Sequence, residues 1–182
     1  MPRTIALRMV TCAALGLACI LSFTACNQST AQNAAGSAGA VKLEIKTWDE
    51  VQAVIKGHAG KIVVMDTWST SCEPCMKEFP GLVALHKKYG PDKVACISLS
   101  CDYSGVGKPE EVAPPVLEFL QKQNATFQNF LSKDDDSSLF TKLDIPSIPA
   151  LFIYGKDGKL AKKIDGDFQY KDVEPIVAGL LK

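Results

Sequence analysis

The chain has 182 residues, and its 20 basic and 20 acidic side chains give a formal net charge of zero. This length is sufficient for one domain with a substantial hydrophobic core. The balanced charge provides no basic surface of the kind that binds nucleic acid, so that class of partner is not expected. The seven cysteines fall into three separate groups rather than into the pattern of a disulfide framework.

The N-terminus has the pattern of an export signal. Arg3 and Arg8 are followed by an uncharged, mostly apolar segment, residues 9–25. As a helix this segment would span about 25 Å, which is short of a ~30 Å hydrocarbon core. A signal peptide over residues 1–25 is therefore favoured over a permanent transmembrane leader, which remains the alternative.

Residues 23–26, Phe-Thr-Ala-Cys, resemble a bacterial lipobox, in which the cysteine is lipidated and becomes the mature N-terminus. The resemblance predicts lipidation of Cys26 and hence a membrane anchor; simple cleavage after Ala31 is the alternative. Residues 26–40 carry neither charges nor large apolar side chains, so we expect a flexible tether. The folded domain is then residues 41–182, outside the cytosol, where disulfides persist.

The first half of this domain predicts alternating strands and helices. Apolar alternation indicates a strand at 41–45, and a capping box of Thr47 and Glu50 indicates a helix over 48–57. Buried-type strands follow at 61–67 and 93–100. Between them a helix is expected over 73–89, kinked at Pro80 and stopped by the Gly-Pro-Asp sequence at 90–92.

The second half predicts a different arrangement. Glycine and proline at 105–115 indicate a loop, after which we expect a helix at 116–123 and a short strand at 126–131. The remaining predicted elements are an acid-led helix at 137–143, strands at 150–154 and 160–164 joined by a turn, and an amphipathic helix at 170–181. The order requires parallel crossovers first and an antiparallel hairpin at the end, an α/β fold.

The most informative motif is Cys72-Glu73-Pro74-Cys75, which follows an apolar strand and begins a predicted helix. The helix dipole and free N–H groups at a helix N-terminus stabilise a thiolate, so we expect Cys72 to be the nucleophile. Cys75 lies on the same face of the first turn and can pair with Cys72 or resolve a mixed disulfide. Pro74 suits the first turn, and the charge of Glu73 favours the reduced pair.

Other interpretations of the cysteines are weaker. Half of a zinc site needs a second ligand pair, which Cys96 and Cys101 do not supply, and a structural disulfide does not fit the strand–helix context. In an extended strand Cys96 and Cys101 would lie about 17 Å apart on opposite faces, so they should not pair. Packing is expected for both, with a third redox thiol at Cys101 as the less favoured alternative. No metal or cofactor is expected.

Residues 61–182 resemble a thioredoxin-fold domain. The resemblance rests on Asp66 and Trp68 before the motif, on Pro80 in its helix, on the Ser-Ile-Pro sequence at 147–149 before a strand, and on Gly166. An insertion at roughly 101–135 and the Glu-Pro pair within the motif are similar to the TlpA/ResA-type extracytoplasmic thioredoxins. Ser71 departs from the pattern, because thioredoxin has tryptophan before its first cysteine.

The resemblance implies roles for several residues. Asp66 would be buried beneath the cysteines and relay a proton for Cys75, and Glu78 would tune both thiols. Pro149 would be cis and present the backbone of Ile148 to an extended substrate. The other residues implied at the substrate surface are Trp68, Glu73 and Pro74.

The resulting hypothesis is an exported, membrane-tethered thiol–disulfide oxidoreductase that reduces disulfide-containing proteins and is itself reduced by a membrane thiol donor. Family resemblance implies cytochrome c maturation as one setting. A thiol peroxidase on the same fold is an alternative, although Met65 stands where a peroxidase motif has proline. A non-enzymatic metal-binding module is the other.

Overall fold

A computed structural model describes residues 39–182 and shows a six-stranded mixed sheet. The expected signal peptide, Cys26 and nearly all of the tether lie outside the described residues. In chain order the strands are β1 (Glu44–Lys46), β2 (Ile62–Trp68), β3 (Val94–Ser100), β4 (Gln128–Ser132), β5 (Ala150–Tyr154) and β6 (Leu160–Asp165). The helices are α1 (Trp48–Gly57), α2 (Glu73–Lys93), α3 (Pro109–Gln123), α4 (Asp136–Leu143) and α5 (Tyr170–Leu181).

The strands lie in the order β1-β4-β3-β2-β5-β6. The pairs β1–β4, β4–β3 and β3–β2 are parallel, whereas β2–β5 and β5–β6 are antiparallel. The predicted change from parallel crossovers to a terminal hairpin is therefore confirmed. β2 and β3 are buried along their whole length, as expected for strands covered on both faces.

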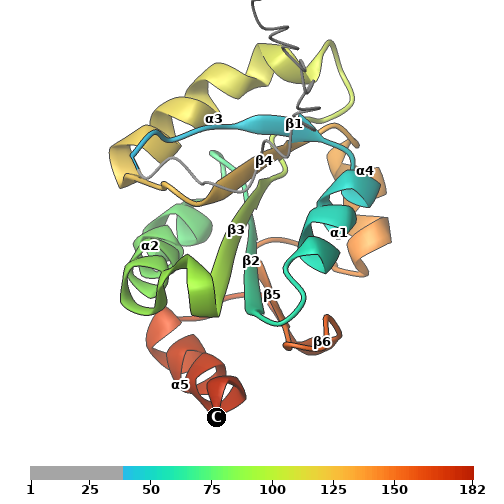
Figure 1. The fold of residues 1–182 in the computed structure, drawn as a ribbon. Helices are drawn as coiled ribbons and strands as arrows, with labels where there is room; N and C mark the ends of the chain where they lie inside the picture. The colour runs from blue at the N-terminus through green and yellow to red at the C-terminus, as the bar shows by residue number, and fades with distance from the viewer. Residues whose placement is uncertain (1–38) are drawn as a thin grey trace, which may run out of the picture. The chain divides into compact units, whose positions relative to one another are not determined.

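The helices cover the two faces of the sheet separately. Figure 1 shows α2 and α5 on one side and α1 and α4 on the other. Apolar side chains on one face of β2 and β3 pack with α2, α3 and α5 in one core cluster, and those on the other face pack with α1 and α4 in a second. Alternation along β2 explains the division, because Val64 belongs to the first cluster and Met65 to the second.

The helix that carries the Cys-x-x-Cys motif breaks where the sequence predicts its end. α2 begins at Glu73 with Cys72 as its N-cap, and a short helical turn after the break at Gly90 continues to Lys93. Its one residue with non-helical dihedral angles is Gly90 (φ 67°, ψ 165°), so the backbone breaks there rather than at Pro80. Glycine tolerates this positive φ, and the short turn after it leads directly into β3.

The predicted loop at 105–115 is wrong in its second part. α3 begins at Pro109, and Pro114 and Pro115 lie inside it. Pro109 suits the first turn, whereas Pro114 and Pro115 lie in the second turn and each remove one intrahelical hydrogen bond. Burial of Val116 and Leu120 then favours the helix over the loop that composition alone indicates.

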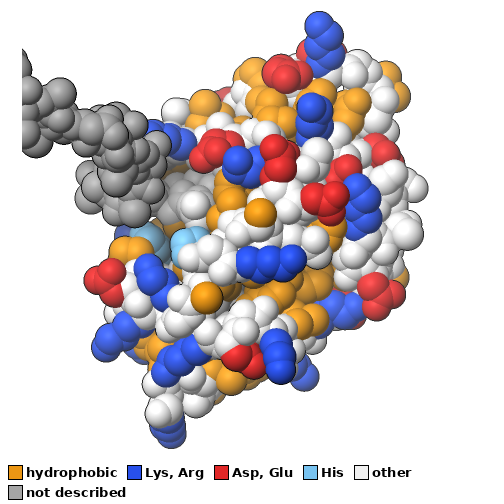
Figure 2. Space-filling view, turned by 45° about the vertical axis from the view of Figure 1, so that its right-hand side comes forward, with side chains coloured by type: hydrophobic (Ala, Val, Ile, Leu, Met, Phe, Trp, Pro, Cys, Tyr) orange, Lys and Arg blue, Asp and Glu red, His pale blue; other side chains and the backbone are white. Residues whose placement is uncertain are grey.

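The surface of the domain is of mixed charge. Lys and Arg side chains are interspersed with Asp and Glu on the face that Figure 2 shows. Among residues 39–182, no helix combines the length and the apolarity that a membrane span requires.

Candidate active site

The Cys-x-x-Cys motif lies where the central strand β2 passes into α2. Parallel strands place their carboxyl ends at one edge of a sheet, and ligand and active sites of such folds gather at that edge. β2 ends at Trp68, and four residues later Cys72 forms the N-cap of α2. The motif is thus held between a strand that is fully buried and a helix that packs against it.

Cys72 and Cys75 form a disulfide with a Cα–Cα distance of 5.3 Å. Cys72 is partly exposed, whereas Cys75 is only 2% exposed. The backbone N–H of Cys75 donates to Cys72 Sγ at 3.3 Å. In the reduced state this donor and the N-terminal dipole of α2 would stabilise a Cys72 thiolate. An incoming substrate can reach Cys72 but not Cys75.

A polar network that the sequence analysis missed holds the chain just before the motif. Asp102 follows β3 and accepts hydrogen bonds from the Thr70 backbone N–H at 3.0 Å and from the Thr70 and Ser100 hydroxyls. Ser69 and Ser71 hydroxyls bond each other at 2.9 Å. A carboxylate can accept strong hydrogen bonds from several donors at once, so this network holds the backbone of residues 69–71 in place just before Cys72. Ser71 in this segment is the position at which thioredoxin has tryptophan.

Asp66 lies on β2 and is 1% exposed. Burial raises the pKa of its carboxyl group from 3.8 to about 7. A hydrogen bond from the Tyr170 hydroxyl at 2.7 Å lowers this pKa, and the nearby charge of Glu78 raises it further. A carboxyl group with this pKa can both take up and release a proton near neutral pH.

Tyr170 was not predicted as a site residue. It is the first residue of α5, and its sequence position indicated only the start of an amphipathic helix. Its backbone N–H donates to Glu78 Oε2 at 3.3 Å, and its hydroxyl donates to Asp66 Oδ2. Tyr170 therefore contacts both of the acidic residues that the family resemblance indicated.

The peptide bond between Ile148 and Pro149 is cis. The loop is tied to the end of β6, because the Gly166 N–H donates to the Pro149 carbonyl at 3.0 Å, and Gly166 has a φ of 83°. A pocket of about 360 Å³ lies beside this loop. Its wall includes Pro74, Glu78, Pro149, Phe168 and Gln169.

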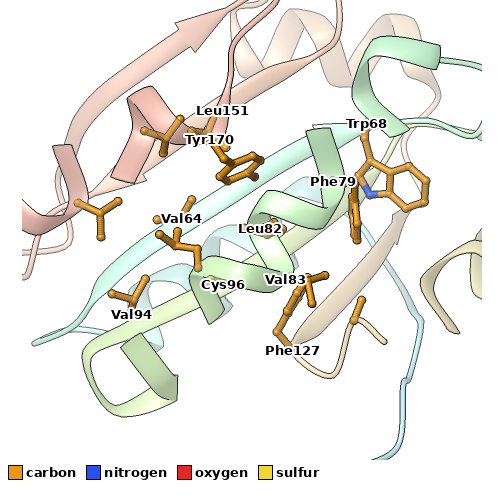
Figure 3. Packing of buried hydrophobic residues seen from close by; sticks show 14 of the residues in the cluster. Val64, Trp68, Phe79, Leu82, Val83, Val94, Cys96, Phe127, Leu151 and Tyr170 are labelled. Atoms are coloured by element: carbon orange, nitrogen blue, oxygen red, sulfur yellow. The ribbon is translucent and has the colours of Figure 1, made fainter. Parts of the chain in front are cut away.

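The remaining predicted residues differ in exposure. Glu73 and Pro74 are exposed at the start of α2, on the side where Cys72 is accessible. Trp68 is fully buried, with its ring 5.0 Å from that of Phe79 and 4.8 Å from that of Phe119. Figure 3 shows Trp68 and Phe79 together in the core cluster. Trp68 thus supports α2 from beneath and does not reach the surface.

The other two cysteines of the described chain are free and buried on opposite faces of the sheet. Cys96 packs with α2 and α5, and Cys101 packs with the cluster of α1 and α4. Burial raises the thiol pKa of both cysteines, which keeps them protonated and unreactive. Within residues 39–182 no group of three or more His, Cys, Asp or Glu side chains is arranged to hold a metal ion.

Fold and site together define a thioredoxin-fold protein with a Cys-x-x-Cys disulfide at the start of its long central helix. Solved structures show the same fold. A putative thiol:disulfide interchange protein DsbE from Chlorobium tepidum matches with a TM-score of 0.59 and 18% identity, over 70% of this chain and 85% of that one. A thiol-disulfide isomerase from Corynebacterium glutamicum matches with a TM-score of 0.60 and 16% identity, over 80% and 97%.

The chain belongs to the AhpC/TSA family, whose sequence profile matches residues 37–163. A curated relative, the thiol-disulfide oxidoreductase ResA of Bacillus cereus, is 29% identical over 120 residues. The match covers 66% of this chain and 64% of the relative. The matched part of the chain thus spans a little under two thirds of that relative's length.

Proposed function

We propose that this protein is a thiol–disulfide oxidoreductase that reduces disulfide bonds in other proteins. The observation that carries the proposal is the unequal exposure of the pair, with Cys72 accessible at the helix N-terminus and Cys75 buried behind it. A nucleophile must meet its substrate, whereas a resolving thiol needs only to reach the nucleophile. The name of the ResA relative supports the same activity.

The reaction follows from this geometry. The Cys72 thiolate attacks one sulfur of a substrate disulfide, and the other substrate sulfur leaves as a thiolate that takes up a proton. Cys75 then loses its proton and attacks Cys72 Sγ, which releases the second substrate thiol and leaves the Cys72–Cys75 disulfide. The substrate gains two electrons and two protons, and a thiol donor must return them to the pair.

Neighbouring groups would serve these steps. Asp66 would take the proton of Cys75, because its pKa of about 7 allows it to be charged at neutral pH. Glu78, one turn along α2 from Cys75, would adjust the reactivity of both thiols. The cis loop at Ile148 and Pro149 would pair with an extended substrate. The adjacent pocket would receive side chains of that substrate.

The direction and setting of the reaction belong to the same proposal. We infer that the domain is exported, tethered through Cys26, and reduced by a membrane thiol donor, with disulfides of apocytochrome c as one substrate class. The reduction potential of the Cys72–Cys75 couple tests the direction. A value near or below about −270 mV supports a reductant, and a value near about −120 mV would show that the protein oxidises thiols instead.

Cysteine substitutions test the mechanism. Cys72→Ser should reduce the turnover of a peptide disulfide by at least about a hundredfold, because the attacking thiolate is lost. Cys75→Ser should instead accumulate a mixed disulfide with the substrate, detectable by mass spectrometry. Cys101→Ala is the matched control and should retain turnover. Activity in Cys72→Ser would contradict the mechanism, and turnover of hydrogen peroxide rather than disulfides would favour a peroxidase.

A further inference from the structure

The buried hydroxyl of Tyr170 bonds the carboxyl group of Asp66 across the core. We propose that Tyr170 is a positioning residue for the reaction, which holds Asp66 so that one carboxyl oxygen is left to exchange a proton with Cys75. This inference rests on the proposed function. It concerns a residue on α5, about a hundred positions from the cysteine motif in sequence.

The two oxygens of Asp66 have different environments. Oδ2 accepts from the Tyr170 hydroxyl at 2.7 Å, whereas buried Oδ1 has no hydrogen-bond partner within residues 39–182. A buried carboxylate oxygen without a partner is costly in free energy, and structural sites rarely keep one. Asp66 lies between Val64 and Trp68 on the face of β2 that packs with Cys75. The Asp66 carboxyl group is therefore on the same face of β2 as the resolving thiol.

Tyr170 is itself held at three points. Its hydroxyl bonds Asp66, its backbone N–H bonds Glu78, and its ring lies directly against Gly81. A Cβ atom at Gly81 would clash with the Cβ, Cγ and Cδ2 atoms of Tyr170, so only glycine allows the ring to approach α2 this closely. Figure 3 shows the ring inside the core cluster, near Leu151. A side chain fixed in this way can fix the carboxyl group that it bonds.

The hydroxyl remains a donor over the range in which the carboxyl group titrates. Burial raises the pKa of Tyr170 well above its ordinary value, so the phenol keeps its proton while Asp66 changes charge. The other titratable groups near this carboxyl are Glu78 on α2, and Cys96 and Cys101 at β3. Cys75, on the same face of β2, becomes titratable only when the disulfide is reduced. Both β3 thiols have raised pKa values and stay neutral, which leaves Tyr170 as the hydrogen-bond donor that favours the charged carboxylate.

The test is Tyr170→Phe, which keeps the ring against Gly81 and removes only the hydroxyl. The carboxylate then loses its hydrogen bond, so the Asp66 pKa should rise by about one unit. Carbon-13 NMR of the oxidised protein measures this pKa, with Asp66→Asn assigning the signal. Tyr154→Phe is the matched control, because Tyr154 packs on the opposite face of the sheet, and it should leave the titration unchanged.

The same variants are compared in turnover across pH. The resolution step in Tyr170→Phe should be about fivefold slower at pH 7 and recover above pH 8, because the carboxylate forms only at higher pH. In an Asp66→Asn background the Tyr170 change should no longer move the pH profile. A purely structural role would slow the reaction equally at every pH, and that result would overturn the proposal.

The two readouts separate this inference from the function on which it rests. An unchanged Asp66 titration in Tyr170→Phe overturns the positioning role even if the wild-type protein reduces disulfides. If the Asp66 pKa rises in Tyr170→Phe but the pH profile of turnover does not change, the proposed proton exchange between Asp66 and Cys75 is overturned. Failure of the wild-type protein to exchange any disulfide overturns the proposed function, and with it the role of Tyr170 in turnover, whatever the titration shows.

Discussion

Asp66 makes the folded state less stable at the pH at which its proposed proton transfer would take place. Its pKa is raised from 3.8 to about 7 by burial, so the folded protein holds this proton more tightly than the unfolded chain does. For an acid with a raised pKa, stability falls as pH rises from the unfolded value to the folded one. The rise corresponds to about 4 kcal/mol of stability, which is lost between pH 4 and pH 7.

Asp66→Asn should therefore stabilise the protein at high pH. Asparagine keeps the size of the side chain and an oxygen for the Tyr170 hydroxyl, but it has no charge to bury. At pH 8 we expect the variant to be more stable than the wild type by several kcal/mol, and at pH 4 the difference should nearly vanish. Urea unfolding of the oxidised proteins at both pH values measures this. A difference that is the same at both would show that the carboxyl group does not titrate as described.

At the scale of elements, the site depends on how closely α5 packs against α2. The two helices meet where the Tyr170 ring lies on Gly81, and the Glu78 carboxylate accepts from the first N–H of α5. Glycine inside a helix costs about 0.5–1 kcal/mol relative to alanine, so its presence at position 81 requires a reason. That reason is the space that it leaves for the tyrosine.

Alanine at two helical glycines should have opposite effects. Gly81→Ala should destabilise the protein by a few kcal/mol, because the new methyl group overlaps the buried Tyr170 ring. Gly179→Ala, in α5, meets nothing within 4 Å and should stabilise by about 0.5–1 kcal/mol. Thermal unfolding of the two variants checks both signs. Equal effects would mean that the approach of the two helices tolerates a side chain.

Elements with a strong local signal were predictable from the sequence. The capping box of Thr47 and Glu50 is present at the start of α1, and α5 has the predicted bounds Tyr170–Leu181. The predicted first strand at 41–45 lies instead at Glu44–Lys46, where it pairs with β4. That position, like the start of α3, is determined by contacts with distant parts of the chain.

The site was predictable only where the motif was local. The Cys-x-x-Cys spacing alone predicts Cys72 and Cys75 as a redox pair, and the two are disulfide-bonded in the structure. Asp102 and Tyr170 contact Thr70 and Asp66 from 32 and 104 residues away, and neither lies in a recognisable pattern. A tyrosine at the start of an amphipathic helix gives no signal of a buried carboxyl group opposite it. Such partners are brought together by the packing of distant elements. The periodicity of a sequence indicates local helices and strands but not which of them pack together.

At the scale of the whole molecule, the proposed tether would determine where the site can act. If Cys26 is lipidated as proposed, the chain expressed in bacteria with its own leader should fractionate with membranes. Cys26→Ala should move it to the soluble fraction, because a single anchor of this kind supplies the membrane affinity. Cys12→Ala is the matched control within the leader and should not change the fractionation. Retention of Cys26→Ala in the membrane fraction would indicate an uncleaved leader instead.

The burial of the free thiols of Cys96 and Cys101 has a consequence for which thiol can react with a bound substrate. In the proposed mechanism, each cycle passes through a covalent complex whose disulfide any accessible thiol could cleave, and a third exposed thiol near the site would provide a competing exit. Cys96 and Cys101 are buried on opposite faces of β3, with the sheet between them. Within the described domain only Cys75 could then resolve the proposed covalent complex, and the domain itself would offer no competing disulfide partner.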